Sequence, residues 1–283
     1  MFTRTIFAKF FYLFYFIKMF YDRAQGNTSY LPRYVLLFGD ASYDPLDRIP
    51  NNTNFVPAYE SNSSDYPIGT YTSDDFFVCL DLNEGGNELT SSLPDVGIGR
   101  IVVNTVGSAK EMVDKVIHYV TDPSTMRDWR NFVCFIGDDE DSNLHIDQAD
   151  QLATKVDTTY DNYNVDKIYL DAYVQSYSSG GQRYPDVKTA LLRRIGRGAL
   201  TINWTGHGGE LGWAHERIFE TPDIIALDNW NNLPIFVTAT CEFSRFDDPE
   251  RTAAGEWVQL NPRGGVLPFS PQRASLLPMK ILT

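Results

Sequence analysis

Short β-rich apolar runs alternate with helical stretches along most of the chain, and this order limits the possible folds more than any other feature. The runs lie at 33–40, 74–81, 95–103, 131–138, 166–173, 198–205 and 233–240. Several are almost continuously apolar, as expected for strands covered on both faces. The alternation predicts parallel βαβ units with right-handed crossovers, and therefore an α/β fold with a mostly parallel sheet and helices on both faces.

Stretches between the predicted strands show the apolar period of amphipathic helices, at 108–122, 145–156 and 185–196. Ser108 stands where the first helix is expected to begin, and hydroxyl side chains are good N-terminal caps. Pro185 opens the third stretch, and proline is well tolerated in the first turn of a helix.

Chemically reactive side chains follow the predicted strands. In open α/β sheets, ligands bind beyond the carboxyl ends of the strands. We therefore expect one rim of the sheet to gather the side chains that come at these ends: Asp40, Asp138, His207 and Cys241.

The two runs "TINWTGHGG" and "IFVTATCEF" carry the sharpest chemical signal. Glycines on both sides of His207 let the backbone turn sharply and approach a ligand. The spacing to Cys241 leaves room for one crossover segment, so the two strands are predicted neighbours. In that arrangement His207 is a base for the Cys241 thiol, and the backbone N–H groups of Gly208 and Cys241 supply an oxyanion hole.

The cysteine count of three is odd and too low for a disulfide scaffold. Cys79 and Cys134 lie inside strand-like runs, which predicts that both pack as small buried hydrophobes. Cys241 comes after its strand, where a substrate can reach it.

Other chemistries lack parts of their motifs. The four histidines show no H-E-x-x-H spacing and the cysteines no C-x-x-C spacing, which argues against a metal centre. The "GHGG" stretch is similar to an esterase oxyanion loop, but the chain has no G-x-S-x-G nucleophile elbow. The "VGIGR" stretch lacks the third glycine of a dinucleotide-binding loop.

A formal net charge of −13 excludes nucleic acid as an expected partner, because phosphates would be repelled. The densest acidic run, "DDEDSN" at 138–143, is predicted to be a solvated loop. The N-terminal segment 1–30 has an apolar run from Phe10 to Ile17 that is too short to span a membrane. We expect a helix packed on the sheet there rather than a cleaved signal peptide.

The reactive motifs stand in a family-specific order. "LLFGDASYDP", "YTSDDFF", "LPDVGIGRIVV" and "FIGDDED" precede the histidine and cysteine runs, and together they resemble the gingipain family of cysteine peptidases. The resemblance extends from about residue 18 to about residue 266. Within the family the chain is most similar to the sortases of the type IX secretion system, because "GEWVQLNPRGG" after the cysteine also has a counterpart there.

The resemblance implies a caspase-like three-layer fold and peptide-bond cleavage by a thiolate. It implies Cys241 as nucleophile and His207 as base, with Asp139 orienting the histidine and Asp138 as the alternative. No cofactor is required, and structural calcium is permitted without assigned ligands. Residues 31–266 would form the catalytic domain. The proline-rich tail 267–283 is atypical and suggests a truncated or frame-shifted product.

The resemblance also implies protein or peptide substrates, and secreted cargo with a C-terminal signal domain if the chain is a sortase. It implies export to the outer membrane or cell surface. Arginine-specific members have an acidic residue where this chain has His145, so a preference for basic side chains is not expected. A non-catalytic cell-surface binding module, or an inactive fragment on the same scaffold, remains the alternative.

Overall fold

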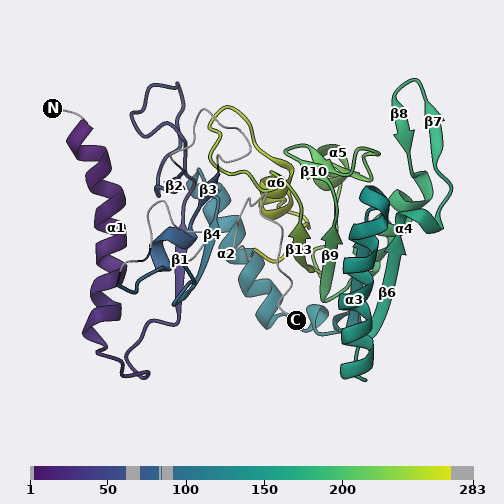
Figure 1. Cartoon of the computed structure of the whole chain (residues 1–283), viewed down its shortest axis with the longest axis horizontal. Helices are drawn as coiled ribbons and strands as arrows, with labels where there is room; N and C mark the ends of the chain where they lie inside the picture. Colours follow the sequence, from purple (N-terminus) through teal and green to yellow (C-terminus); the bar gives the residue numbers. More distant parts are fainter. Residues whose placement is uncertain (1–2, 62–70, 83, 85–91, 269–283) are drawn as a thin grey trace. The chain divides into compact units, whose positions relative to one another are not determined.

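The computed structural model describes residues 3–61, 71–82, 84 and 92–268, without the side chains of residues 3–9. The chain forms two compact units (Figure 1). The first consists of the chain up to Asn104 together with Arg245–Thr252, and the second consists of Thr105–Ser244 and Ala253–Pro268. The predicted tail lies outside the described residues except for Leu267 and Pro268.

The second unit is built on a four-stranded, fully parallel sheet with the order β13-β9-β5-β6. Its strands are β5 (Phe132–Gly137), β6 (Asn164–Tyr169), β9 (Thr201–Thr205) and β13 (Ile235–Ala239). β5, β9 and β13 lie inside runs predicted as strands, and β6 begins two residues before the predicted run 166–173. The order is that of crossover connections, which confirms the α/β class and the mostly parallel sheet.

Helices cover both faces of this sheet. In β5, Cys134 and Ile136 are fully buried in one cluster with Leu191 of α4 (Pro185–Arg197). The alternate residues Val133 and Phe135 pack with Ala153 of α3 (Leu144–Thr159). Successive strand residues point to opposite faces, so the two clusters form the two halves of a three-layer core. Each fully buried large apolar side chain contributes about 1.5–3 kcal/mol.

Smaller elements complete the second unit. They are α2 (Val106–Thr121), α5 (Thr221–Ile225), α6 (Ala254–Leu260), the hairpin β7 (Ser176–Ser178) with β8 (Gly181–Arg183), and the three-stranded sheet β10 (Gly208–Gly209), β11 (Gly212–Trp213), β12 (Phe219–Glu220). Short 3-10 helices lie at Pro123–Thr125, Asp128–Asn131, Asp141–Asn143 and Leu170–Ala172.

Helix α2 differs from its prediction at the N-terminus. Its cap is Thr105, whose side chain accepts a hydrogen bond from the backbone of Ser108, while Ser108 caps in return. Ser108 is therefore the third helical residue of a reciprocal capping box rather than the cap itself. Further along α2, Lys115 is fully buried and donates to the carbonyl oxygens of Gln259 and Gly264.

The first unit contains helix α1 (Thr3–Arg23) and a parallel strand pair, β1 (Tyr34–Phe38) and β4 (Gly97–Ile101). A second pair, β2 (Tyr59–Glu60) and β3 (Thr72–Ser73), is antiparallel. Ile17 of α1 is buried in one cluster with Leu37 of β1 and with Phe77. The N-terminal segment is thus a helix packed on a sheet, as predicted, and no helix among the described residues is long and apolar enough to cross a membrane.

One predicted strand is wrong. Within 74–81 the chain forms a 3-10 helix, η1 (Asp75–Val78), and Phe77 N donates to the carbonyl of Asp74. Three successive residues of η1 are buried, Phe76, Phe77 and Val78. A short apolar run is compatible with a buried strand and with a buried helical turn. The hydrophobic pattern alone therefore could not distinguish the two, and the strand prediction was wrong.

Arg100 of β4 is the most enclosed charge in the first unit. It is fully buried, and its guanidinium forms a bidentate pair with Asp74 at 2.8 and 2.6 Å. Its remaining donors reach the carbonyl oxygens of Gly39, Val56 and Pro57 at 2.8–3.1 Å. All five N–H groups of a guanidinium are thereby satisfied.

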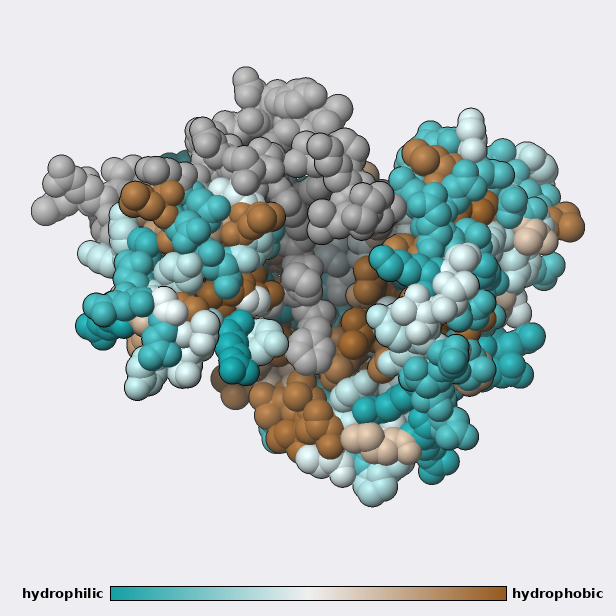
Figure 2. Space-filling view, turned by 60° about the horizontal axis from the view of Figure 1, so that its bottom comes forward, coloured by the Kyte–Doolittle hydropathy of each residue, from teal (hydrophilic) through white to brown (hydrophobic). Residues whose placement is uncertain are grey.

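Hydrophilic side chains predominate on the visible surface around α3 and α4 (Figure 2). This distribution agrees with the net charge of −13, because unpaired carboxylates stay in water.

Candidate active site

Strands β9 and β13 are parallel neighbours, and their register pairs Thr205 with Ala239. His207 and Cys241 each come two residues beyond this last pair. Gly206 N donates to the carbonyl of Ala239 at 3.2 Å, which ties the two exits together. The prediction that the two strands are adjacent is confirmed, and both reactive residues leave the same edge of the sheet at the same level.

The segments that follow the two strands touch each other at Gly208. A Cβ atom at this position would lie 2.4 Å from Thr240 Oγ1, far inside van der Waals contact. Only glycine therefore allows the histidine loop to pack against the residue that precedes Cys241. The backbone amides expected to form an oxyanion hole, those of Gly208 and Cys241, belong to these two touching segments.

Asp138, directly after β5, holds the backbone of the histidine loop. It is fully buried, and its Oδ2 accepts a hydrogen bond from His207 N at 2.8 Å. A Cβ atom on Gly206 would lie 2.4 Å from Asp138 Cβ, so this glycine permits the contact. Burial raises the pKa of the Asp138 carboxyl. Asp138 thus binds the amide of His207.

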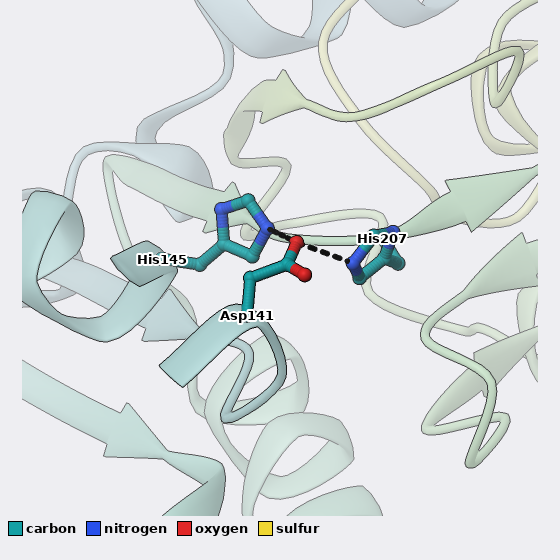
Figure 3. Close-up of side chains that lie close together, drawn as sticks. All are labelled: Asp141, His145 and His207. Atoms are coloured by element: carbon teal, nitrogen blue, oxygen red, sulfur yellow. Dashed lines mark hydrogen bonds and ion pairs between the residues drawn. The ribbon is translucent and has the colours of Figure 1, made fainter. Parts of the chain in front are cut away.

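The imidazole of His207 faces a different carboxylate (Figure 3). His207 Nε2 lies 3.0 Å from Asp141 Oδ2 and 3.6 Å from Glu140 Oε2. Asp139, the carboxylate expected to orient the ring, instead accepts a hydrogen bond of 2.6 Å from the hydroxyl of Tyr184. The group that the structure brings to the imidazole is therefore two residues further along the same acidic run.

A left-handed turn carries Asp141 to this place. Asp141, Ser142 and Asn143 have φ angles of 55°, 60° and 64°, directly before α3. Aspartate and asparagine tolerate this conformation better than most residues, which makes "DDEDSN" suited to such a turn. The acidic run predicted to be a solvated loop is therefore a tight, ordered turn beside the histidine, although Asp141 keeps 58% of its side chain exposed.

Two more histidines surround His207. His145, in the first turn of α3, meets the His207 ring edge-on with centroids 5.2 Å apart, and its Nε2 is 3.3 Å from Asp141 Oδ2. His215 stacks on the His207 ring with centroids 5.3 Å apart and places its Nδ1 3.0 Å from Glu140 Oε2. Motif spacing did not reveal this cluster, because its members come from three separate segments.

The Cys241 thiol is partly buried, and it is a free cysteine. Burial and the neighbouring Glu242 carboxylate raise its pKa. The thiol is accordingly protonated near neutral pH, so a base is needed to make it a nucleophile. Cys79 and Cys134 are both buried, as predicted, and burial raises the pKa of Cys134 strongly.

A stacked pair of tryptophans is hydrogen-bonded to the loop that carries His207. Trp204 of β9 and Trp213 of β11 are fully buried and stack with ring centroids 5.4 Å apart at an interplanar angle of 7°. Trp204 Nε1 donates to the backbone carbonyl of His207 at 3.2 Å. The loop that presents His207 is therefore bonded at its amide by Asp138 and at its carbonyl by Trp204.

Asp40, the fourth residue predicted at the rim, belongs to the other unit. It follows β1, which pairs with β4 and not with the four-stranded sheet. It is buried, accepts hydrogen bonds from Thr53 Oγ1 and Ala41 N, and has its pKa raised by burial to about 6. The expectation of a single rim was wrong, because the strands divide between two sheets.

Asp81, Glu84 and Asp95 place carboxylate oxygens within 4.8 Å of one another in the first unit. Oxygen ligands are those that calcium prefers, so this donor set fits the structural calcium permitted by the sequence. Asp81 and Asp95 also accept hydrogen bonds from the Tyr21 hydroxyl at 3.0 and 3.3 Å.

Comparison with known proteins agrees with the geometry. The model of peptidase family C25 matches residues 13–276, whereas no curated protein matches the chain. A crystal structure of the Arg-specific cysteine proteinase gingipain R aligns with a TM-score of 0.60 and 19% identity, over 90% of this chain and 50% of that one. A complex of the pro- and mature domains of RgpB from Porphyromonas gingivalis aligns with a TM-score of 0.60 and 19% identity, over 93% and 55%.

A third structure, described as a protease, aligns with a TM-score of 0.62 and 17% identity, over 90% of this chain and 48% of that one. At these identities the structures show a common fold, which is the caspase-like α/β fold of the gingipains. The chain spans about half the length of the proteins it matches. The family match covers nearly all of it, and the chain therefore belongs to peptidase family C25, the gingipain family of cysteine-type peptidases.

Proposed function

We propose that this chain carries the catalytic dyad of a cysteine endopeptidase, with Cys241 as nucleophile and His207 as base. The observation that carries the proposal is the register of β9 and β13, which puts both residues two positions beyond one strand pair. The contact between Gly208 and Thr240 supports it, because it holds the two segments together. A nucleophile and base must be within hydrogen-bond reach in the reacting complex.

The hydrogen bond to Asp141 selects the imidazole nitrogen that acts. A neutral imidazole has one N–H donor and one acceptor, and Nε2 faces a carboxylate, so Nε2 carries the proton. Nδ1 is then the nitrogen that accepts the proton from the Cys241 thiol. Asp141 stabilises the imidazolium that forms, which is the role expected at the sequence level for Asp139 or Asp138.

The reaction follows from these assignments. Cys241 Sγ forms a bond to the scissile carbonyl carbon, and the amides of Gly208 and Cys241 bind the developing oxyanion. The C–N bond then breaks, and the leaving amine takes the proton from His207 Nδ1. Water or another amine resolves the thioester, giving hydrolysis or transpeptidation respectively.

A finer role as the sortase of type IX secretion is supported by the segment after the cysteine. "GEWVQLNPRGG" forms most of α6 and the following turn, in which Asn261 donates to the carbonyls of Ile224 and Leu227. In this role the chain acts outside the cytoplasm on cargo that ends in a signal domain. Formation of an amide product with an added amine would separate transpeptidation from hydrolysis.

The dyad is tested by labelling the folded chain with a peptidyl acyloxymethyl ketone, followed by mass spectrometry of the modified residue. We expect modification at Cys241 alone and its loss in His207→Ala. Because the pKa of Cys241 is raised, labelling of the His207→Ala thiol should increase only above the usual thiol range of about 8.5.

Cys134→Ala is the matched control, because Cys134 is fully buried in β5 and should label only after unfolding. Labelling of native Cys134, or equal labelling of Cys241 with and without His207, would exclude the dyad. The remaining interpretation would then be a binding module on a peptidase scaffold.

A further inference from the structure

We propose that Asp141, His145 and His207 form a binding site for Zn²⁺, and that an ion held there switches off the His207 base. The site is defined by ligand atoms of this chain, and its existence does not depend on peptidase activity. Only the inhibitory effect rests on the proposed function.

The spacing of the ligand atoms fits a tetrahedral ion. Zn–N and Zn–O bonds of 2.0–2.2 Å put neighbouring tetrahedral ligands about 3.3 Å apart. Asp141 Oδ2 lies 3.0 Å from His207 Nε2 and 3.3 Å from His145 Nε2. One possible ligand atom from each of the three residues lies within 4.8 Å of the other two. Glu140 Oε2 lies 3.6 Å from His207 Nε2 but is not part of this group of mutually close ligand atoms, so the site has three protein ligands.

His145 supplies an independent indication. Both of its ring nitrogens are shielded from solvent, and neither makes a hydrogen bond to a described residue. Nδ1 has no partner, and Nε2 has only the 3.3 Å ion-pair contact with Asp141 Oδ2. A buried polar nitrogen without a partner costs about 1–3 kcal/mol, which a metal bond would offset. Its Nε2 points at the same carboxylate oxygen as His207 does, so the two rings converge on one point (Figure 3).

The donor set selects the metal. Two imidazole nitrogens with one carboxylate suit Zn²⁺ and neighbouring transition metals, whereas calcium and magnesium prefer oxygen ligands.

Binding changes the tautomer of the proposed base. An imidazole that coordinates Zn²⁺ through Nε2 uses the Nε2 lone pair and, while neutral, carries its proton on Nδ1. Nδ1 is the atom that would accept the Cys241 proton. The ion displaces the Nε2–H···Asp141 hydrogen bond and blocks the base without touching the thiol.

The site is tested by titrating Zn²⁺ into chelator-treated full-length Cys241→Ala protein by calorimetry, so that no thiolate at that position contributes. We expect one ion per chain, and Co²⁺ in its place should give the intense visible absorption of a tetrahedral site. Adding His145→Ala should weaken Zn²⁺ binding by at least tenfold, since even losses outside the ligand shell cost about 10–100-fold.

The matched control is His118→Ala. His118 also lies near a carboxylate, 3.5 Å from Asp122, but it bonds Asn231 and stacks on Trp230. Zn²⁺ binding should be unchanged in this variant. Equal affinity in the Cys241→Ala protein with and without His145, or an equal loss with His118→Ala, would overturn the site.

Activity measured with and without Zn²⁺ separates the two claims. Inhibition of wild type at concentrations that spare His145→Ala supports the switch, and equal inhibition of both would overturn it in favour of metal binding at the thiol. Zn²⁺ binding that depends on His145 in a chain without peptidase activity would leave the site standing and reject the proposed function.

Discussion

Arg100 in the first unit and His207 in the second are both charged or chargeable groups beside an aspartate, but their surroundings differ. The guanidinium of Arg100 is fully buried, and Asp74 with three carbonyl oxygens satisfies every N–H. Around His207, side-chain atoms without hydrogen-bond partners include Asp138 Oδ1, Asp139 Oδ1 and both nitrogens of His145.

The difference separates a structural site from a functional one. A saturated network has no capacity left for a ligand, so Arg100 and Asp74 hold the fold. Unsatisfied polar groups are costly where they are buried, and proteins retain them where a substrate or ion completes the set. The comparison predicts that changes at Arg100 act on stability and that changes at His207 act on chemistry.

The largest effect is expected for Cys241→Ala, which should abolish peptide cleavage because no other described thiol reaches the surface. His207→Ala should lower kcat/KM by about 10²- to 10⁴-fold through loss of the base. Neither change should alter the free energy of unfolding by more than about 1 kcal/mol. Turnover assays measure kcat/KM, and urea denaturation measures the free energy of unfolding. A loss of stability in Cys241→Ala or His207→Ala as large as that expected for Arg100→Met would contradict the distinction between a structural and a functional site.

Arg100→Met should lower the free energy of unfolding by about 3–5 kcal/mol, because it leaves Asp74 buried without a counter-charge. Urea denaturation followed by circular dichroism measures the loss. Arg100→Met combined with Asp74→Leu should recover much of it, since both charges are then absent. A single variant as stable as wild type would mean that water reaches this pair.

Asp40 of the first unit and Lys115 of the second should make the free energy of unfolding depend on pH in opposite directions. The pKa of Asp40 is raised to about 6, so its contribution to stability is complete below about 3.9 and is lost as pH rises through 6. The pKa of Lys115 is lowered to about 7 by burial, so its contribution is complete above about 10.4 and is lost as pH falls through 7.

These effects are on the order of 3 kcal/mol for Asp40 and about 5 kcal/mol for Lys115. Urea denaturation from pH 4 to 10 measures them. Asp40→Asn should flatten the acidic limb of the stability curve, and Lys115→Met should flatten the basic limb. If the stability of the combined Asp40→Asn and Lys115→Met variant still depends on pH in both ranges, other groups cause the pH dependence.

The smallest effect is expected for Asp141→Asn, which keeps the hydrogen bond to His207 but removes the negative charge that stabilises the imidazolium. A tenfold fall in kcat/KM corresponds to about 1.4 kcal/mol, a modest value because Asp141 is largely exposed. Asp139→Asn is the control, since that carboxylate bonds Tyr184. The assays are run in chelating buffer. A larger loss of activity in Asp139→Asn than in Asp141→Asn would favour Asp139, the residue expected from the sequence, as the group that orients His207.

Patterns repeated along the chain predicted the second unit well. The strand exits of His207 and Cys241 were predictable because β9 and β13 are β-rich runs with one crossover between them. The neighbour of the imidazole was not predictable, since it depends on three successive left-handed residues, Asp141–Asn143, that shift the acidic run relative to β5.

The proposed Zn²⁺ site could not be predicted from the spacing of residues along the chain. Metal motifs assume ligands on one helix or one turn, whereas the Zn²⁺ ligands proposed here come from two segments joined by the fold. The run at 74–81 has a hydrophobic pattern that fits a strand and a helical turn equally well, so its 3-10 helix could not be predicted from that pattern.

The stacked pair Trp204–Trp213 gives this chain a built-in optical reporter. Two parallel indoles couple their electronic transitions, so the folded protein should show an exciton signal in circular dichroism that disappears in Trp213→Phe. Since the Trp204 indole N–H is bonded to the His207 carbonyl, any occupant that shifts the histidine loop should change that signal. Occupancy of the site can thus be followed by light, without substrate and without a label.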